Sequence, residues 1–178
     1  MRTSILENLQ GVCKILNEEG VEYLAIGGAA VALHGHERWS TTPSGEEASV
    51  PDLDFWYNPT YDNYFRVLNA LEKLGENVNS FRAEKTPDPR RSFFRLERPL
   101  YTLDLLPSVP GLPRFREAFA AKETTKLGDF DIPVIGYAHL IQNKQALGRP
   151  KDQEDIRQLE LKKQGEKARQ HRPRQRPH

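Results

Sequence analysis

The chain has 178 residues, of which 37% are hydrophobic and 29% are charged, and it contains one cysteine, Cys13. This length suits one domain of ordinary size, and a single cysteine excludes an intrachain disulfide. No stretch is apolar for long enough to span a membrane. The first twenty residues carry three glutamates in an amphipathic pattern, which is unlike a secretory signal, so we expect a cytoplasmic protein with no membrane partner.

The charge is distributed unevenly along the chain. Residues 162–178 carry seven Lys or Arg and one Glu, which leaves about −5 for the rest of a chain whose net charge is +1. No large aliphatic residue follows Leu161. We therefore predict a folded domain over residues 1–161 and a basic, disordered tail over residues 162–178. Such a tail could bind nucleic acid or a partner protein, or could simply be solvated.

The N-terminal half of the chain alternates helical and β-rich patterns. Apolar spacing and glycine or proline breaks predict a helix over 4–19, a strand over 21–26, a helix over 29–34, an exposed loop from Thr41 to Pro51, a strand over 52–57, and a helix from Thr60 to Gly75.

The C-terminal half continues with both kinds of element. The patterns predict two strands over 92–97 and 101–106 that form a hairpin, a helix over 115–122, a strand over 131–135, and helices over 138–147 and 153–163. This order predicts an α+β domain.

A glycine pair joins the first predicted strand to a helix. Because Gly27 and Gly28 directly precede the helix, backbone N–H groups at its start would suit a phosphate group. A Gly-Gly pair also serves any tight strand-to-helix turn.

Two aspartates begin the second predicted strand. Side chains alternate along a strand, so Asp52 and Asp54 project from one face while Leu53 projects from the other. Such a pair can be a solvated edge, but here it lies directly before the apolar run Phe55-Trp56-Tyr57. Like charges beside a core are costly, and a divalent cation would relieve the repulsion.

Asp104 is the single charged residue in the predicted strand over 101–106. Taken alone, it could be a hydrogen-bonded core residue. Together with Asp52 and Asp54 it would give three carboxylates on neighbouring strands, opposite a glycine turn. These are the parts that phosphoryl transfer assisted by two metal ions requires.

Five segments of the chain carry a resemblance to a known family, in the family's order: IGGAAVALHG at 26–35, Arg38, DLDFW at 52–56, TLDLL at 102–106 and LIQNKQALGRPKDQEDI at 140–156. The chain resembles the minimal nucleotidyltransferases of the DNA polymerase β-like superfamily, including the bacterial toxin–antitoxin type (AbiEii/MNT-like).

The resemblance implies a nucleotidyltransferase fold, with a small mixed β-sheet flanked by helices. It also implies transfer of a nucleoside monophosphate from an NTP such as ATP to a hydroxyl of RNA, protein or a small molecule. By this analogy Mg²⁺ or Mn²⁺ would be held by Asp52, Asp54 and Asp104, and Asp104 would also act as a base. The nucleotide phosphates would lie near Gly27, Gly28, Lys144, Arg149 and Lys151.

The chain departs from the family pattern at two places. Gly28 stands where serine is frequent, and the Thr41 to Pro51 loop lengthens the path between the glycine turn and the aspartate pair. Two alternatives to an enzyme therefore stay open. One is a catalytically inactive binding or antitoxin-like module with the same fold, and the other is a nucleic-acid-binding protein led by its tail. The three cationic residues could also form a solvated helix face.

Overall fold

A computed structural model of the chain describes residues 5–35 and 50–170. In chain order its elements are α1 (Ile5–Glu18), β1 (Tyr23–Ile26), α2 (Gly27–Leu33), β2 (Asp52–Tyr57), α3 (Tyr61–Lys73), α4 (Asn79–Arg82), the 3-10 helix η1 (Pro89–Arg91), β3 (Phe94–Glu97), β4 (Thr102–Leu106), α5 (Phe115–Ala120), β5 (Glu123–Leu127), β6 (Phe130–Val134), α6 (Tyr137–Leu147) and α7 (Pro150–Gln170).

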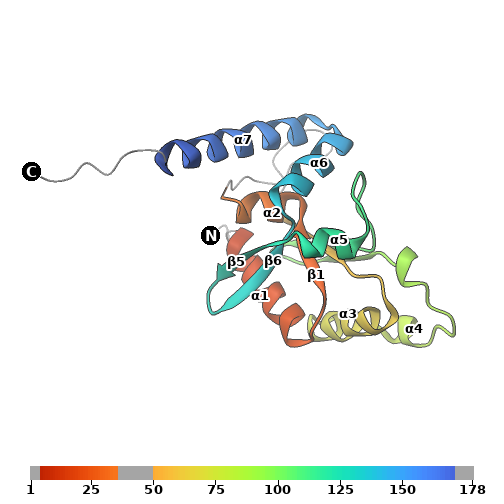
Figure 1. The fold of residues 1–178 in the computed structure, drawn as a ribbon. Helices are drawn as coiled ribbons and strands as arrows, with labels where there is room; N and C mark the ends of the chain where they lie inside the picture. Colours follow the sequence, from red (N-terminus) through yellow and green to blue (C-terminus); the bar gives the residue numbers. More distant parts are fainter. Residues whose placement is uncertain (1–4, 36–49, 171–178) are drawn as a thin grey trace, which may run out of the picture.

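The strands form one six-stranded sheet in the order β3-β4-β2-β1-β6-β5. The pairs β1–β6 and β2–β4 are parallel, while β1–β2, β3–β4 and β5–β6 are antiparallel. The expected mixed sheet flanked by helices is therefore confirmed, as is the hairpin of β3 and β4 (Figure 1).

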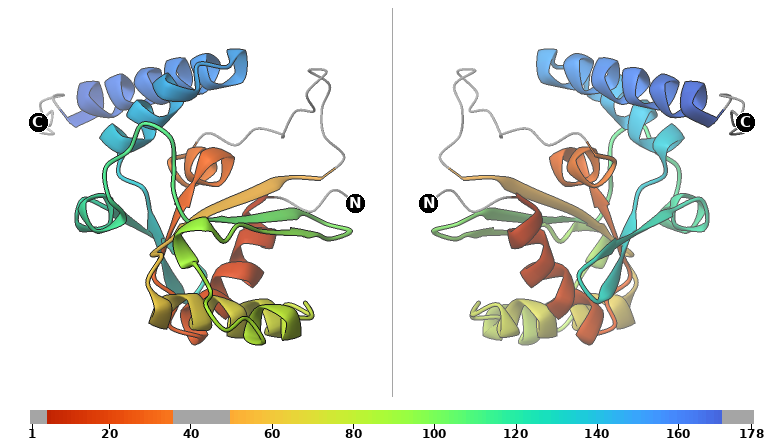
Figure 2. Two further views of the ribbon diagram at one scale, coloured as in Figure 1. Left: turned by 90° about the vertical axis from the view of Figure 1, so that its right-hand side faces the viewer. Right: turned by 90° about the vertical axis from the view of Figure 1, so that its left-hand side faces the viewer.

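One face of the sheet is covered by α1 and α3, which lie on the same side of it (Figure 2). The Tyr23 ring meets Phe55 edge-on at 5.4 Å, and its hydroxyl donates to Asn17 of α1 at 2.9 Å. Tyr64 of α3 packs on Phe94 at 5.9 Å between ring centroids. These aromatic side chains, with the aliphatic residues around them, form the core of the domain.

The opposite face carries different neighbours. At the C-terminal end of β2, Trp56 meets Phe115 of α5 edge-on at 5.3 Å. Because Trp56 lies two and four residues after Asp54 and Asp52, all three side chains project to this face. The aspartates therefore lie on the side of the sheet away from α1 and α3.

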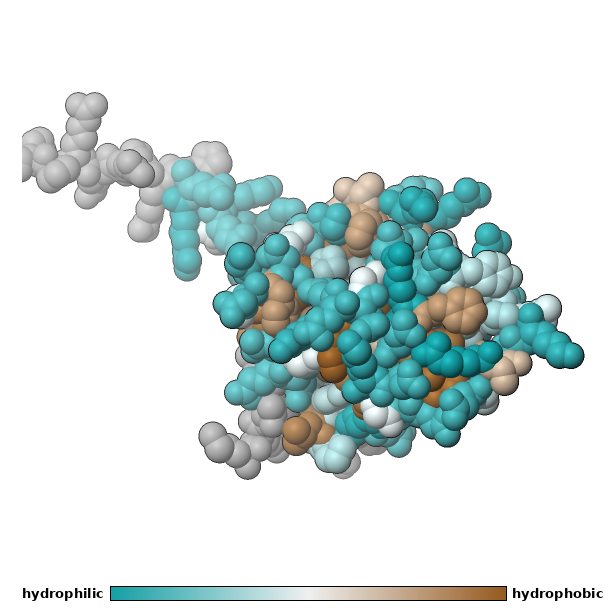
Figure 3. Space-filling model, turned by 90° about the horizontal axis from the view of Figure 1, so that it is seen from below, coloured by the Kyte–Doolittle hydropathy of each residue, from teal (hydrophilic) through white to brown (hydrophobic). Residues whose placement is uncertain are grey.

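Helix α3 shows how sequence pattern sets local structure. The side chain of Thr60 accepts a hydrogen bond from the backbone N–H of Asn63 and caps the helix, which begins where the sequence predicts. Val67, Leu68 and Leu71 are buried. The outer surface at the bottom of Figure 1 is mostly hydrophilic, with only scattered hydrophobic side chains (Figure 3). The apolar stripe therefore faces the sheet.

The structure differs from the sequence expectations at the tail and at β5, and it also contains the short helices α4 and η1, which were not predicted. The tail was expected to be disordered from residue 162, but α7 continues to Gln170, so residues 162–170 are helical. Strand β5 was not predicted, because its sequence Glu-Thr-Thr-Lys-Leu is polar and largely exposed. It lies at an edge of the sheet, where one-sided burial gives little apolar signal. Residues 171–178 lie outside the described part.

None of the helices within 5–35 and 50–170 combines the length and apolar composition that crossing a membrane requires.

Candidate active site

Strand β2 presents two aspartates on one face. Leu53 and Phe55 are fully buried on the other face, so alternation places Asp52 and Asp54 together. The parallel pairing of β2 with β4 sets Asp54 opposite Asp104. The three predicted carboxylates therefore project from the same face of the sheet.

The junction of β1 and α2, where Ile26 is followed directly by Gly27, lies against this face. Ile26 pairs with Asp54 across β1 and β2, and the next residue, Gly27, has a φ of 57°. A Cβ atom at Gly27 would stand 2.5 Å from Oδ2 of Asp54, whereas a Cβ at Gly28 would meet nothing within 4 Å. Only glycine fits at position 27 without displacing the carboxylate, because both the backbone conformation and the space exclude a side chain.

The carboxylates disturb one another. Burial, followed by the charges of Asp104 and Asp52, raises the pKa of Asp54 to about 6. Burial also raises the pKa of Asp104, with the Asp52 charge adding to the rise and the Arg95 guanidinium opposing it. Concentrated negative charge of this kind favours a cation or a proton.

The two carboxylate oxygens of Asp104 have different surroundings. Its Oδ2 lies 3.4 Å from Nη1 of Arg95, but its Oδ1 is buried and has no hydrogen-bond partner among the described residues. A buried carboxylate oxygen without a partner is costly and is a natural ligand for a hard cation.

The donor set fits a partly hydrated Mg²⁺ better than a fully enclosed ion. Within the described residues, no three Asp, Glu, His or Cys side chains converge closely enough to enclose a metal by themselves. Mg²⁺ is commonly held by one or two carboxylates, with water and substrate phosphates completing its shell. Asp54 and Asp104, with Asp52 beside them, can supply that share.

The predicted cationic residues come from the α6–α7 hairpin. Lys144 is buried, with its Nζ 2.7 Å from Oδ2 of Asp155 and 3.2 Å from Oδ1 of Asp152. Nε of Arg149 lies 2.6 Å from Oδ2 of Asp152. The ammonium of Lys144, predicted to lie near phosphates, is thus already paired with two carboxylates. Arg149 and Lys151 are better placed than the buried Lys144 to contact a phosphate group in the cavity.

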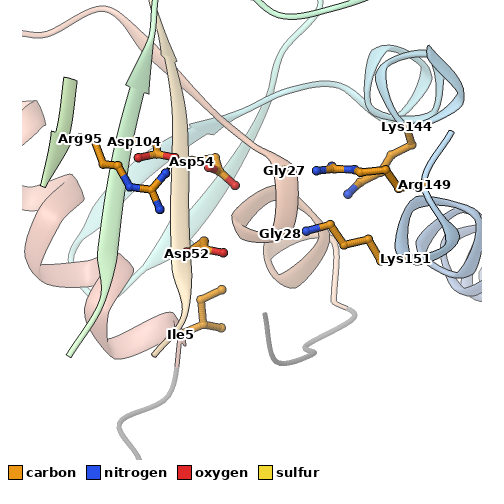
Figure 4. Close-up of a pocket in the computed structure, with 10 residues that line it drawn as sticks. All are labelled: Ile5, Gly27, Gly28, Asp52, Asp54, Arg95, Asp104, Lys144, Arg149 and Lys151. Carbon is orange, nitrogen blue, oxygen red and sulfur yellow. Dashed lines mark hydrogen bonds and ion pairs between the residues drawn. The ribbon is translucent and has the colours of Figure 1, made fainter. Parts of the chain in front are cut away.

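One cavity of about 180 Å³ brings these groups together. Figure 4 shows the aspartates on one side, the cationic ends of Arg149 and Lys151 on the other, and the glycine turn between them. All eight predicted site residues line it, and so do two that were not predicted. The lining comprises Ile5, Gly27, Gly28, Asp52, Asp54, Arg95, Asp104, Lys144, Arg149 and Lys151.

Arg95 was missed in the sequence. The predicted strands leave residues 98–100 as the connection, which would set Arg95 opposite Leu103, whereas the observed register sets it opposite Asp104. Ile5 could not be predicted either, because its place at the cavity depends on how α1 packs.

Some residues singled out in the sequence are outside the described part of the chain. These are Arg38, most of the Thr41 to Pro51 loop (residues 41–49) and residues 171–178.

The fold is that of the nucleotidyltransferases. The structure is similar to the lincosamide antibiotic adenylyltransferase LnuA in its lincomycin-bound form, with a TM-score of 0.56 and 18% identity over 86% of this chain and 95% of that one. An antigenic nucleotidyltransferase-like protein from Paracoccidioides brasiliensis aligns with a TM-score of 0.49 and 18% identity over 88% of this chain and 73% of that one. Neither the protein-family models nor the curated proteins contain a match.

Proposed function

We propose that the chain is a metal-dependent nucleotidyltransferase that moves a nucleoside monophosphate from an NTP to a hydroxyl group. The observation that carries the proposal is the cavity itself. Carboxylates with raised pKa values stand on one side and two cations on the other, around a turn where only glycine fits. The nucleotidyltransferase fold supports the same reading.

The triphosphate would occupy the cationic side. Arg149, directly before α7, and Lys151, in the first turn of α7, line the cavity. There they would offset the charge of the phosphates. The amide groups at Gly27 and Gly28 would donate to phosphate oxygens. Because Gly28 has open space around it, a phosphate could approach its backbone closely.

The acceptor would enter from the carboxylate side, near Asp104 and Arg95. Asp104 would take the proton of the acceptor hydroxyl while the oxygen forms a bond to the α-phosphorus and the bond to pyrophosphate breaks. Mg²⁺ held by Asp52, Asp54 and Asp104 would supply charge neutralisation for the phosphates and lower the pKa of the attacking hydroxyl.

The donor and acceptor can be narrowed by analogy. LnuA is an adenylyltransferase and its structure holds lincomycin, which supports ATP as the donor and a small hydroxyl compound as the first acceptor to test. Hydroxyl groups of RNA and of protein are alternative acceptors within the same proposal. The toxin–antitoxin role that the sequence resemblance implies also belongs to the proposal.

The test is a transfer assay with each α-labelled NTP, Mg²⁺ or Mn²⁺, and pools of RNA, protein and small hydroxyl compounds. We expect label in one pool with the wild-type protein and none with Asp54→Asn or Asp104→Asn. Glu166→Gln, at an exposed position of α7, is the control and should retain transfer.

Binding measurements separate this proposal from the inactive alternative. Calorimetry with the same nucleotides should show binding that requires the metal ion. Nucleotide binding without transfer to any pool would favour an inactive binding module, and absence of nucleotide binding would overturn the proposal.

The nucleic-acid reading of the tail has its own test. Residues 162 and 163 belong to α7, where Lys162 donates to the His34 carbonyl at 2.7 Å and Lys163 lies 3.7 Å from the centre of the Tyr137 ring. Deletion of residues 171–178 therefore spares these contacts. If the tail leads binding, the deletion should weaken RNA or DNA affinity and its salt dependence.

A further inference from the structure

A buried cluster of charges joins α6 to α7. The side chain of Lys144 is 2% exposed, and those of Asp152 and Asp155 are fully buried. Arg149 is the fourth member, contacting Asp152 while remaining half exposed. The two positive and two negative charges balance, which is the condition under which buried ions are tolerated.

Asp152 is the member that contacts both cations. Its Oδ1 accepts from Nζ of Lys144 at 3.2 Å and from Nη2 of Arg149 at 3.1 Å, and its Oδ2 accepts from Nε of Arg149 at 2.6 Å. Burial alone would raise the pKa of Asp152, but these hydrogen bonds and charges outweigh it and hold the pKa below its ordinary value. Asp152 is therefore ionised and held in place.

The two hydrogen bonds fix the plane of the Arg149 guanidinium. A bidentate carboxylate–guanidinium pair has one preferred geometry, and the bonds made by Nε and Nη2 leave Nη1 without a partner among residues 5–35 and 50–170. Arg149 lines the cavity. The hydrogen bond to Asp152 is the main cause that raises the pKa of Arg149, and the charge of Asp54 in the cavity adds to the rise.

Asp155 offers a natural comparison. Like Asp152, it is a fully buried carboxylate on α7 that accepts a hydrogen bond from Lys144, at 2.7 Å. The Arg149 guanidinium donates its two hydrogen bonds to Asp152. Both carboxylates therefore accept a hydrogen bond from the buried Lys144, and Asp152 in addition accepts from the Arg149 guanidinium that lines the cavity.

We propose that Asp152 is a positioning residue for the nucleotide, which holds the Arg149 guanidinium toward the β- and γ-phosphates. Lys144 is the buried counter-ion of Asp152 and Asp155, and does not bind phosphate. The inference rests on the proposed function, because it assigns an NTP to the cavity.

The test compares Asp152→Asn with Asp155→Asn in the full-length protein. Both remove one buried carboxylate charge beside Lys144, so both should lower the stability of the fold. Affinities for an NTP and for the matching NMP are measured by calorimetry with Mg²⁺. We expect Asp152→Asn to weaken NTP binding about tenfold, the loss of roughly one charge-assisted hydrogen bond, with NMP binding unchanged. Asp155→Asn should stay within about twofold for both ligands.

Arg149→Lys is a second variant, at a half-exposed position. It leaves the buried side chains of Lys144, Asp152 and Asp155 unchanged, so it tests the proposal without removing a buried charge. Lysine keeps the charge but cannot make the two-point contact with Asp152. We expect the same loss of NTP affinity, and no further loss when Asp152→Asn is added to it. If Asp152→Asn does not fold, the comparison of Arg149→Lys with the wild type decides the question.

The outcomes are distinct. Equal effects of Asp152→Asn and Asp155→Asn on the ratio of NTP to NMP affinity, additive losses in the double variant, or full NTP affinity in Arg149→Lys would each overturn the positioning role while leaving the proposed function intact. A wild-type protein that binds no NTP would overturn both.

Discussion

Asp54 makes the metal-free protein less stable at neutral pH. Its pKa of about 6 in the folded chain stands above the ordinary value of 3.8, so folding favours the protonated form. The stability from this preference is fully present below pH 3.8 and is lost as the pH rises through about 6. The difference between the two pKa values corresponds to roughly 3 kcal/mol.

Asp54→Asn should therefore stabilise the metal-free fold at about pH 7.5 by up to roughly 3 kcal/mol, and the gain should shrink to about 1 kcal/mol or less near pH 4. Urea unfolding at both values measures this. Added Mg²⁺ should raise the stability of the wild type and leave Asp54→Asn nearly unchanged. A gain that is independent of pH would contradict the electrostatic cause.

The two glycines should respond differently to the same substitution. Gly27→Ala forces a side chain onto a φ of 57° and places its Cβ 2.5 Å from Oδ2 of Asp54, so we expect a loss of at least about 1–2 kcal/mol. Gly28→Ala meets nothing within 4 Å and replaces glycine within a helix, so stability should stay equal or rise by up to about 1 kcal/mol. Thermal unfolding of the pair checks this, and equal losses would rule out the steric explanation.

At the scale of elements, Lys144 holds α7 against α6. Lys144→Met removes a cation that contacts two fully buried carboxylates, of which Asp152 keeps its contact with Arg149. The substitution should cost about 3 kcal/mol at neutral pH and less under acid conditions. Amide hydrogen exchange should show α7 losing protection before β2 and β4 do.

Lys162→Met is the matched control on α7. Its exposed ammonium donates to the His34 carbonyl at 2.7 Å, and the loss of this hydrogen bond should cost about 1 kcal/mol or less. Similar exchange profiles for the two variants would show that the buried cluster does not anchor the helix.

The sequence was most informative where periodicity and backbone chemistry act locally. Strand parity placed Asp52 and Asp54 on one face, and Thr60 marked the start of α3. Parity could not show that Lys144 is paired with Asp152 and Asp155, because that depends on how α6 and α7 pack.

Local pattern also failed at two exposed segments. The last turns of α7 contain no large aliphatic residue that would indicate a helix, yet the helix continues from the buried part before it. Strand β5 draws its stability from pairing with β6 rather than from burial of its own side chains.

At the scale of the whole molecule, the sheet interleaves distant parts of the chain. Strand β1 pairs with β2 on one side and with β6, more than a hundred residues later, on the other. No cut of the chain separates the sheet into two halves with complete cores. We therefore expect the described domain to unfold in a single cooperative step.

Trp56 provides the probe for this prediction, because its side chain is buried against α5. With Trp39→Phe as the background, fluorescence reports on Trp56 alone, while circular dichroism reports on the helices. The two signals should change at the same urea concentration. Separate midpoints would indicate that α7 or the β5–β6 pair melts independently.

Lys144, Arg149 and Lys151 follow the three aspartates in the sequence, and this order has a consequence for synthesis. A ribosome releases the chain from its N-terminus, so Asp52, Asp54 and Asp104 emerge before the cations that face them across the cavity. Until α6 and α7 follow, the growing polypeptide carries these mutually repelling carboxylates without those cations. On the proposed function, we expect nascent chains arrested before residue 144 to lack affinity for an NTP, and chains extended past α7 to have it.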